Sequence, residues 1–327
     1  MFSSRYERAL SELDLDQVKA ASHLVMYPKT FHDMSCIPSG NLQFCHDSAV
    51  IVSALSSAGF AEQTDTAQSS DMVYVHVPRA KGFAQHLIGL ASRVAQDGLV
   101  FVDGAKTDGI DSLLKKIKAR VEILGLVSRA HGKLFWFKSN DQFQDWIEVE
   151  NALIADGFRT RVGLFSATHI DPASQLLAEH FPQNLTGDIA DLGAGWGYLS
   201  AQLLKLPHIG HVDLVEVDRR ALACARLNCA ATRASFHWAD VSTWKERKSY
   251  DVVVMNPPFH ADRKADPEIG RRFISKAASI LKPKGVLYMV ANRHLPYEAH
   301  LDQIFVKVSK IAETNSFKVL TASGPIR

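Results

Sequence analysis

DVVVMNPPFH, residues 251–260, decides how the second half of the chain folds. Its apolar run predicts a buried parallel strand. The strand must stop at Asn256-Pro257-Pro258-Phe259, because proline has no N–H for a sheet hydrogen bond. The segment thus brings an amide, a stiffened backbone and an aromatic ring to one edge of a sheet. Such groups suit a site that holds a planar base or amide by its NH₂ group, although an ordinary Asn-Pro turn has the same residues.

Length and composition bound the class of protein. A chain of 327 residues is long enough for about two domains, and 46% hydrophobic with 22% charged residues is typical of globular proteins. No apolar run reaches the ~18–20 residues of a membrane span, so we expect no membrane partner. The four cysteines have no zinc spacing, which predicts free thiols, no metal and a cytoplasmic location.

The net charge of +2 is unevenly spread along the chain. Residues 1–150 hold 15 lysines and arginines against 18 acidic residues, a balance of −3. Residues 151–327 hold 22 against 17, a balance of +5. The mildly basic second half favours a polyanionic partner such as RNA, but only weakly.

The first half alternates between strand-like and helix-like segments after a helical start at 6–21 and a loop to residue 45. Strands are expected at 71–78, 98–103 and 132–138, and helices at 48–59, 83–95 and 111–121. This pattern predicts an α/β domain with a parallel or mixed sheet. It has no glycine-rich turn after a strand, and His76-Val77-Pro78-Arg79 stands where the second half has NPPF. We interpret residues 1–150 as a domain without a cofactor site.

Polar residues around a helix-like stretch at 146–155 place the domain joint near residue 150. Residues 151–327 then follow a regular pattern, with strands expected at 188–192, 211–217, 235–238, 250–255 and 284–292. The tail is expected to hold a helix at 303–312 and an extended segment at 317–322. The extended segment closes the sheet with an antiparallel hairpin.

A glycine-rich turn, Gly193-Ala194-Gly195-Trp196-Gly197, lies between the first of these strands and the next helix. Glycines there let the backbone approach a ligand closely and leave helix N–H groups free. The turn alone does not identify the ligand, because NAD and FAD sites use a similar one. Glu216 ends the next strand, where a carboxylate can accept both ribose hydroxyls.

Three aspartates refine the choice of ligand. Asp191, just before the glycines, repels a pyrophosphate and attracts an ammonium or sulfonium, which favours S-adenosylmethionine over a dinucleotide. Asp240 falls where an adenine amino group can donate to it, or else it caps the loop near Trp244. Asp218 competes with Glu216 for the ribose, although capping the following helix is its better-supported role.

DLGAGWG, LVEVD, WADV and NPPF, in this order and at these distances, resemble the motifs of class I S-adenosylmethionine-dependent methyltransferases. NPPF resembles the branch that methylates exocyclic or amide nitrogens. Residues 162–177, NPPFH and 290–298 with the later FKVL make the chain similar to the bacterial small-subunit ribosomal RNA guanine-N2 methyltransferases and their large-subunit sister family. The resemblance implies two tandem Rossmann-like α/β domains with mostly parallel sheets. The first, 1–150, is then degenerate, and the second, 151–327, is catalytic.

The resemblance also implies the site residues. S-adenosylmethionine is expected to be held by Asp191, Gly193, Gly195, Gly197, Glu216, Asp218, Asp240, Val241 and Asn256. The Asn256 side-chain oxygen and the Pro257 carbonyl accept the N–H bonds of the target amine, and Phe259 stacks on the base. Catalysis then depends on positioning and electrostatics, and the target base must be unpaired or flipped out.

The expected function is methylation of a guanine N2 in ribosomal RNA, of the small subunit, with ribosomal RNA or a ribosomal subunit as partner and the protein as a monomer. Three other methyltransferases are alternatives: one acting on guanine N2 of large-subunit ribosomal RNA, one on adenine N6 of DNA, and one on protein glutamine. The last two classes commonly carry Tyr where this chain has Phe259. A non-catalytic RNA-binding scaffold is another, against which the intact Asp191, Glu216 and Asn256 argue. The sequence does not determine the nucleotide.

Overall fold

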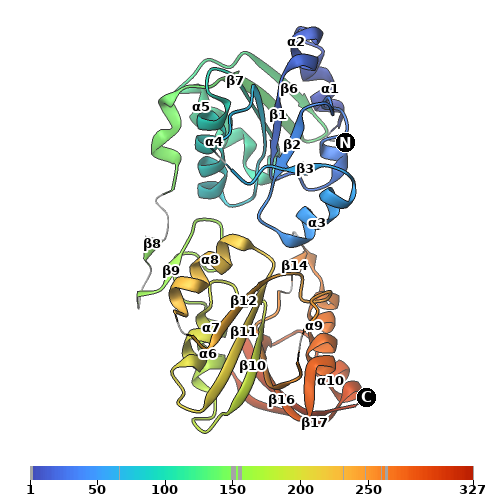
Figure 1. Ribbon diagram of the computed structural model, residues 1–327, viewed down its shortest axis with the longest axis vertical. Helices are drawn as coiled ribbons and strands as arrows, with labels where there is room; N and C mark the ends of the chain where they lie inside the picture. The colour runs from blue at the N-terminus through green and yellow to red at the C-terminus, as the bar shows by residue number, and fades with distance from the viewer. Residues whose placement is uncertain are drawn as a thin grey trace. The chain divides into compact units, whose positions relative to one another are not determined.

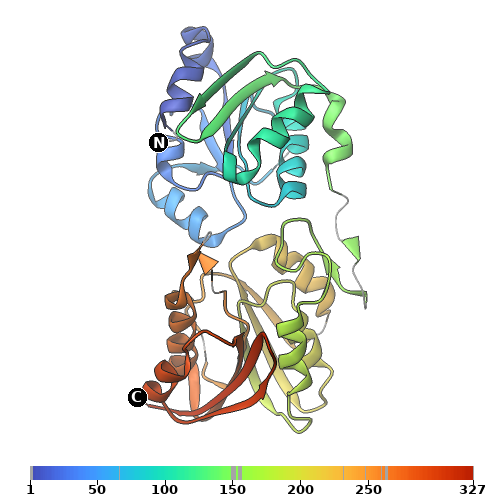
Figure 2. The ribbon, with the colours of Figure 1, turned by 180° about the vertical axis from the view of Figure 1, so that it is seen from behind.

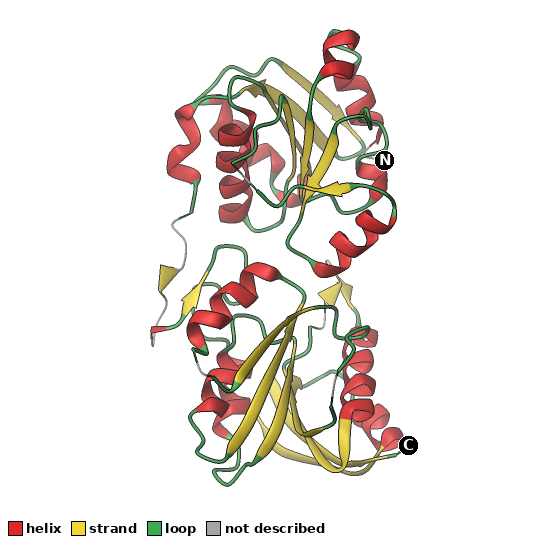
Figure 3. Cartoon of the chain, viewed as in Figure 1, coloured by secondary structure: helices red, strands yellow, loops and turns green. Residues whose placement is uncertain are grey.

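The computed structural model describes residues 3–65, 67–148, 152–153, 157–230, 232–246, 248–258, 260–261 and 264–326. The chain divides into two compact units, Met1–Glu150 and Asn151–Arg327 (Figure 1). Each unit has its own seven-stranded sheet with helices on both faces (Figure 3). In the described part of the chain, no helix is long and apolar enough to span a membrane.

The first unit follows the alternation expected from its sequence. Its helices are α1 (Ser3–Leu10), α2 (Leu15–Ala20), α3 (Ala49–Ser57), α4 (Lys81–Ala95) and α5 (Ile110–Lys118), with 3₁₀ turns η1 (Phe31–Asp33), η2 (Lys106–Asp108) and η3 (Asp141–Trp146). Its strands are β1 (His23–Met26), β2 (Leu42–Cys45), β3 (Ala61–Glu62), β4 (Met72–His76), β5 (Leu99–Ala105), β6 (Gly125–Arg129) and β7 (Gly132–Lys138). They lie in the order β3-β2-β1-β4-β5-β7-β6.

The second unit repeats this plan. Its helices are α6 (Pro172–Glu179), α7 (Tyr198–Leu204), α8 (Arg219–Asn228), α9 (Pro267–Ile280) and α10 (Glu298–Ile304). Its sheet contains β10 (Gly187–Leu192), β11 (Ile209–Glu216), β12 (Ala234–Trp238), β13 (Tyr250–Met255), β16 (Leu281–Asn292), β17 (Phe305–Glu313) and β18 (Phe317–Pro325). Two short hairpins pair β8 (Ala152–Leu153) with β9 (Arg159–Thr160) and β14 (His260–Ala261) with β15 (Lys264–Ala265).

The strand order of the second sheet is β12-β11-β10-β13-β16-β18-β17, which matches that of the first sheet strand for strand. Five strands are parallel, and β18 pairs antiparallel with both β16 and β17. The predicted fold class is confirmed: two tandem α/β units with mostly parallel sheets, the second closed by an antiparallel hairpin.

Alternate residues of β13 enter two different cores, because successive side chains of a strand point to opposite faces. Val252 and Val254 pack in one cluster with residues of α6, α7 and α8. Val253 and Met255 pack in another with residues of α9 and α10. The two groups of helices lie on opposite sides of the sheet (Figure 2). Both faces are covered, so a central parallel strand is apolar throughout rather than alternating.

Three expected segments were wrong. Residues 303–312 are not a helix: α10 ends at Ile304 and the edge strand β17 follows. An edge strand with few buried positions has no clear period, and Val306 is 79% exposed. Of the expected helix at 146–155, the described part holds only the end of η3 and strand β8. Strands β1 and β2 both fall within the expected loop up to residue 45, and they were missed because four-residue strands carry little pattern.

A buried ion pair ties the first helix of the first unit to its sheet. Arg5 donates from Nε to Asp103 Oδ1 at 2.6 Å and from Nη2 to Oδ2 at 2.9 Å. Its Nη1 donates to the Arg129 carbonyl at 3.0 Å. The two charged residues are 2% and 1% exposed. Through these bonds, α1 at the start of the unit is joined to β5 and to β6, which lie far later in its sequence.

Asp103→Asn is expected to destabilise the first unit by about 3–5 kcal/mol, because it removes the carboxylate that pairs with the buried Arg5 guanidinium. Chemical denaturation followed by circular dichroism measures the change. Asp145→Asn is the matched control, since its pair with Arg120 is exposed, and it should leave the unfolding curve nearly unchanged. Equal effects of the two substitutions would contradict this account.

Candidate active site at the carboxyl edge of the second sheet

The glycine turn and the NPPF segment follow the two strands between which the strand order of the second sheet reverses, β10 and β13. Leu192, the last residue of β10, pairs with Met255, the last residue of β13. The glycine turn and the NPPF segment thus leave the sheet side by side. In open α/β sheets this reversal at the carboxyl ends opens a crevice for ligands.

The glycine turn uses left-handed backbone at all three glycines, with φ of 75°, 55° and 89° at Gly193, Gly195 and Gly197. A Cβ on Gly197 would lie 3.0 Å from Cys229 Sγ and 3.1 Å from Ala225 Cβ, so α8 packs there only against glycine. A Cβ on Gly195 would meet nothing within 4 Å. The backbone of Gly195 is therefore open to a ligand, whereas Gly197 is needed for packing.

One cavity is lined by the glycine turn and by the end of β13. Residues of α6 and of the segment before α6 also line it. Its lining residues are Phe165, Asp171, Ser174, Gly193, Ala194, Gly195, Trp196, Tyr198, Leu199 and Asn256. Residues that precede β10 in the chain thus form one wall. Within the described residues, no group of three or more potential metal ligands gathers.

Asp191 lies inside the protein beneath the turn and does not line this cavity. Its side chain is fully buried, and Oδ2 accepts a hydrogen bond from Ser200 Oγ at 2.6 Å. Oδ1 has no hydrogen-bond partner among the described residues. Burial, reinforced by the nearby Glu216, raises the pKa of Asp191 to about 7 against the Ser200 bond, which lowers it. A buried acceptor without a donor is destabilising, so it calls for an N–H from a ligand.

The Glu216 carboxylate holds the turn from the end of β11. Oε2 accepts from the Gly195 N–H at 2.8 Å, and Oε1 accepts from the N–H groups of Val217 and Asp218 at 2.8 and 3.0 Å. Burial raises the pKa of Glu216, and these backbone bonds oppose the rise. Three of about four acceptor positions are therefore taken. One acceptor position therefore remains for a ribose hydroxyl. To accept the second hydroxyl as well, Glu216 would have to share an acceptor position with a backbone N–H.

The two other acids have local partners. Asp218 is the N-cap of α8, accepting from the Arg220 N–H at 2.9 Å, and it pairs with the Arg220 guanidinium at 2.7 Å. Asp240 accepts from the N–H and hydroxyl of Ser242 at 3.0 and 2.7 Å, and its carbonyl accepts from Trp244. Val241 is buried in the core, and in the described part of the chain its N–H has no acceptor.

Asn256 is oriented by the first turn of α6. Its Nδ2 donates to Asp171 Oδ2 and to Ser174 Oγ, both at 2.9 Å. None of the described residues donates to its Oδ1 or to the carbonyl of Pro257, whose ring is buried. Both oxygens are therefore available as acceptors as far as the described residues go. Phe259 lies outside the described residues.

Sequence reasoning missed Asp171 and Ser174 as neighbours of Asn256. The segment Asp171-Pro172 is a typical helix start, with Asp171 accepting from the Ser174 N–H at 2.8 Å and proline in the first turn. That signal predicts the cap. It does not predict a contact with a residue 85 positions later.

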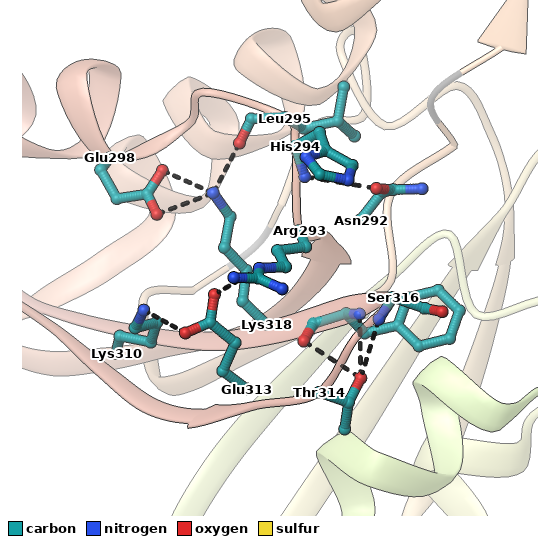
Figure 4. A network of polar contacts seen from close by, with 11 residues as sticks. Asn292, Arg293, His294, Leu295, Glu298, Lys310, Glu313, Thr314, Ser316 and Lys318 are labelled. Carbon is teal, nitrogen blue, oxygen red and sulfur yellow. Dashed lines mark hydrogen bonds and ion pairs between the residues drawn. The ribbon is translucent and has the colours of Figure 1, made fainter.

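A second network of polar contacts holds the loop that follows β16 (Figure 4). Strand β16 itself pairs with β13. Lys318 is 5% exposed and donates to the Leu295 carbonyl at 2.7 Å and to both Glu298 oxygens at 2.7 and 2.8 Å. Arg293, which lies on the same loop, pairs with Glu313 at the end of β17, at 3.1 Å. Lys318 of β18 thereby holds the loop that follows β16, which connects residues 290–298 with the FKVL segment.

The chain was compared with known proteins. The methyltransferase small domain family matches residues 156–321. The ribosomal RNA small subunit methyltransferase C of Shewanella loihica is 30% identical over 272 residues, covering 80% of this chain and 79% of that protein. The protein of the same name from Shewanella pealeana is 31% identical over 271 residues, with the same coverage.

One solved structure shares the whole fold. The T. thermophilus 16S rRNA N2 G1207 methyltransferase (RsmC), in complex with AdoMet and guanosine, superposes with a TM-score of 0.81 at 22% identity. The match covers 98% of this chain and 91% of that one. It supports the tandem arrangement of two similar α/β units. With its matching domain and its relatives at 30–31% identity, this chain belongs to the ribosomal RNA small subunit methyltransferase C family.

Proposed function

We propose that this protein transfers a methyl group from S-adenosylmethionine to the exocyclic N2 of a guanine in 16S ribosomal RNA. The observation that carries the proposal is the orientation of Asn256, whose oxygen is presented as an acceptor beside the glycine turn. The names of the relatives and the ligands of the similar structure support the same reaction. The large-subunit alternative lacks such support.

The described residues fit the cofactor. Asp191, buried beneath the turn with Oδ1 unpartnered, suits the ammonium group through the charge of its ionised form. The backbone at Gly195 is open, which lets the ligand approach the turn closely. Glu216 keeps about one acceptor position for the ribose. The free Val241 N–H and the Asp240 carboxylate suit adenine, whereas Asp218 supports the site by capping α8. When bound, S-adenosylmethionine supplies an electrophilic methyl group on its sulfonium.

The residues after β13 prepare the amine for attack. An exocyclic amine is a poor nucleophile because its lone pair is delocalised into the ring. Asn256 Oδ1 and the Pro257 carbonyl accept its two N–H bonds, which favours a pyramidal nitrogen with its lone pair free. Phe259 stacks on the flipped base. No strong base is needed, since the nitrogen becomes acidic once it is methylated, and catalysis depends on positioning and electrostatics.

The first unit, in this proposal, binds no S-adenosylmethionine. Alignment of the last residues of β1 and β10 puts Tyr27 in the place of Gly193, with φ of 59°. The Tyr27 hydroxyl bonds Asp47, and its ring contacts His46 and Phe83 at 4.4 and 4.8 Å between centroids. A side chain thus occupies the space that the glycine turn leaves open. We propose that this unit extends the RNA-binding surface, in a monomer acting on ribosomal RNA or subunits in the cytoplasm.

Asn256→Ala is expected to lower the single-turnover rate of methyl transfer at least roughly 10²-fold, the usual scale for one preorganised polar contact in a transition state. Cofactor affinity should barely change. The measurement uses unmethylated small subunits and RNA extracted from them, with labelled S-adenosylmethionine and digestion to identify N2-methylguanine. A folded Asn256→Ala protein with the wild-type rate would end the role proposed for Asn256.

Glu216→Ala is expected to weaken S-adenosylmethionine binding by about 2–4 kcal/mol, through the lost charge-assisted bond to the ribose and the lost bond that holds the Gly195 N–H. Asp218→Ala should cost distinctly less, because Asp218 already caps α8 and pairs with Arg220. Calorimetric titration of the full chain measures both and should give one cofactor per chain. The reverse order would identify Asp218 as the ribose ligand, and two cofactors per chain would disprove an empty first unit.

Cofactor affinity is expected to rise with pH up to about 7, because Asp191 must lose its proton to pair with the ammonium group. The protein without cofactor should show the opposite trend in stability. Its folded state keeps a proton on Asp191 that the unfolded state releases, so the unfolding free energy falls as pH rises from about 4 to about 7. Titrations between pH 5.5 and 7.5 test this, and Asp191→Asn should remove the pH dependence.

A further inference from the structure

Asp171 and Ser174 hold the amide group of the proposed catalytic residue, although neither belongs to a motif of the cofactor or substrate site. We propose that Asp171, assisted by Ser174, is a positioning residue that fixes the Asn256 amide with its oxygen toward the substrate, and thereby selects a base that offers an amino group. This inference rests on the proposed function and extends it to a new pair of residues.

The chemistry of the contact determines which end of the amide faces α6. An amide can rotate to exchange its oxygen and its NH₂ group, which differ only in hydrogen-bonding character. A carboxylate only accepts, so the NH₂ group must face Asp171 Oδ2, 2.9 Å away. The reverse orientation would place two acceptor oxygens in contact. Both Nδ2 hydrogens are used, because Ser174 Oγ also lies 2.9 Å from Nδ2.

The acceptors are themselves rigidly held. Asp171 is the N-cap of α6, and the oxygen that receives Asn256 also accepts from the Ser174 N–H at 2.8 Å. Ser174 is 8% exposed, and Leu177, on the next turn of α6, is fully buried in the core. The first turn of α6 is therefore a fixed platform, and Asn256 does not need to organise it.

This arrangement makes the end of β13 a pure acceptor site. With its NH₂ group committed to α6, Asn256 can offer only Oδ1, next to the Pro257 carbonyl. Guanine presents an amino group at C2, whereas hypoxanthine has only hydrogen there and cannot satisfy these acceptors. Desolvated acceptors left without donors discriminate strongly against such an analogue. When the platform is removed, the amide can rotate and this selection weakens.

The test compares Asp171→Ala, Asp171→Asn and Ser174→Ala with the wild-type full-length chain. Asp171→Ala is expected to lower kcat by about 10–10²-fold with cofactor affinity unchanged, since misplaced reacting groups cost about that much. Asp171→Asn should recover much of the rate, because its side-chain oxygen can accept from Asn256 and cap α6. Ser174→Ala should have a smaller effect. Asp14→Ala is the control, because it removes a similar N-cap, that of α2 in the first unit, and should keep the wild-type kcat.

A double-mutant cycle separates positioning from a merely structural role. In an Asn256→Ala background, Asp171→Ala is expected to reduce kcat no further, because the group that it positions is gone. A wild-type kcat in Asp171→Ala, or a full additional loss in the double mutant, would overturn the inference. If Asp171→Ala does not fold, Ser174→Ala decides instead: a lower kcat supports the platform and a wild-type kcat overturns it.

A second readout does not depend on catalysis. The Asn256 side-chain NH₂ should give an NMR signal that is protected from solvent exchange in the wild type, and Asp171→Ala should abolish the protection. Unchanged protection would overturn the inference. A wild-type protein that methylates no guanine N2 yet keeps the protected signal would disprove the proposed function alone, so the two failures are distinguishable.

Discussion

The parallel pairing of β10 with β13 is the constraint on which the site depends. The two strands are adjacent in the sheet but distant in sequence, and their connections leave toward opposite faces. Because parallel strands end at the same edge, this pairing sets the glycine turn next to Asn256. The two-sided burial that makes β13 fully apolar also makes its end rigid. A residue placed there keeps its position without support from the ligand.

The site stores unfavourable interactions that the rest of the second unit must offset. Asp191 is buried with one unpartnered oxygen, and Glu216 is desolvated beside it. The burial of both groups is costly, although backbone N–H bonds offset part of the cost for Glu216. Their common feature is that a bound cation and hydroxyl donors would relieve both. Without a ligand, three backbone N–H groups hold the Glu216 carboxylate in place.

The first unit shows how little of the function lies in the fold itself. Its sheet has the same strand order as the second, and the backbone at Tyr27 keeps the left-handed conformation found at Gly193. In the place of Asn256, however, it has His76, which is 3% exposed and contacts the Tyr6 hydroxyl at 3.2 Å. The same architecture therefore carries different side chains at its carboxyl edge, and in our proposal these side chains decide which unit holds the cofactor.

The elements that could be predicted from the amino-acid sequence are those with a local signal. The apolar runs of β10 and β13, the glycine turn and the proline stop at Asn256 are short-range patterns, and they were enough for the fold class and the family. The edge strand β17 was missed because a half-exposed strand has no strong period. Only the tertiary structure decided which polar groups face each other. The burial of Asp191, the bonds that occupy Glu216 and the platform of Asp171 and Ser174 under Asn256 join residues brought together by the sheet, and no local pattern records such a contact.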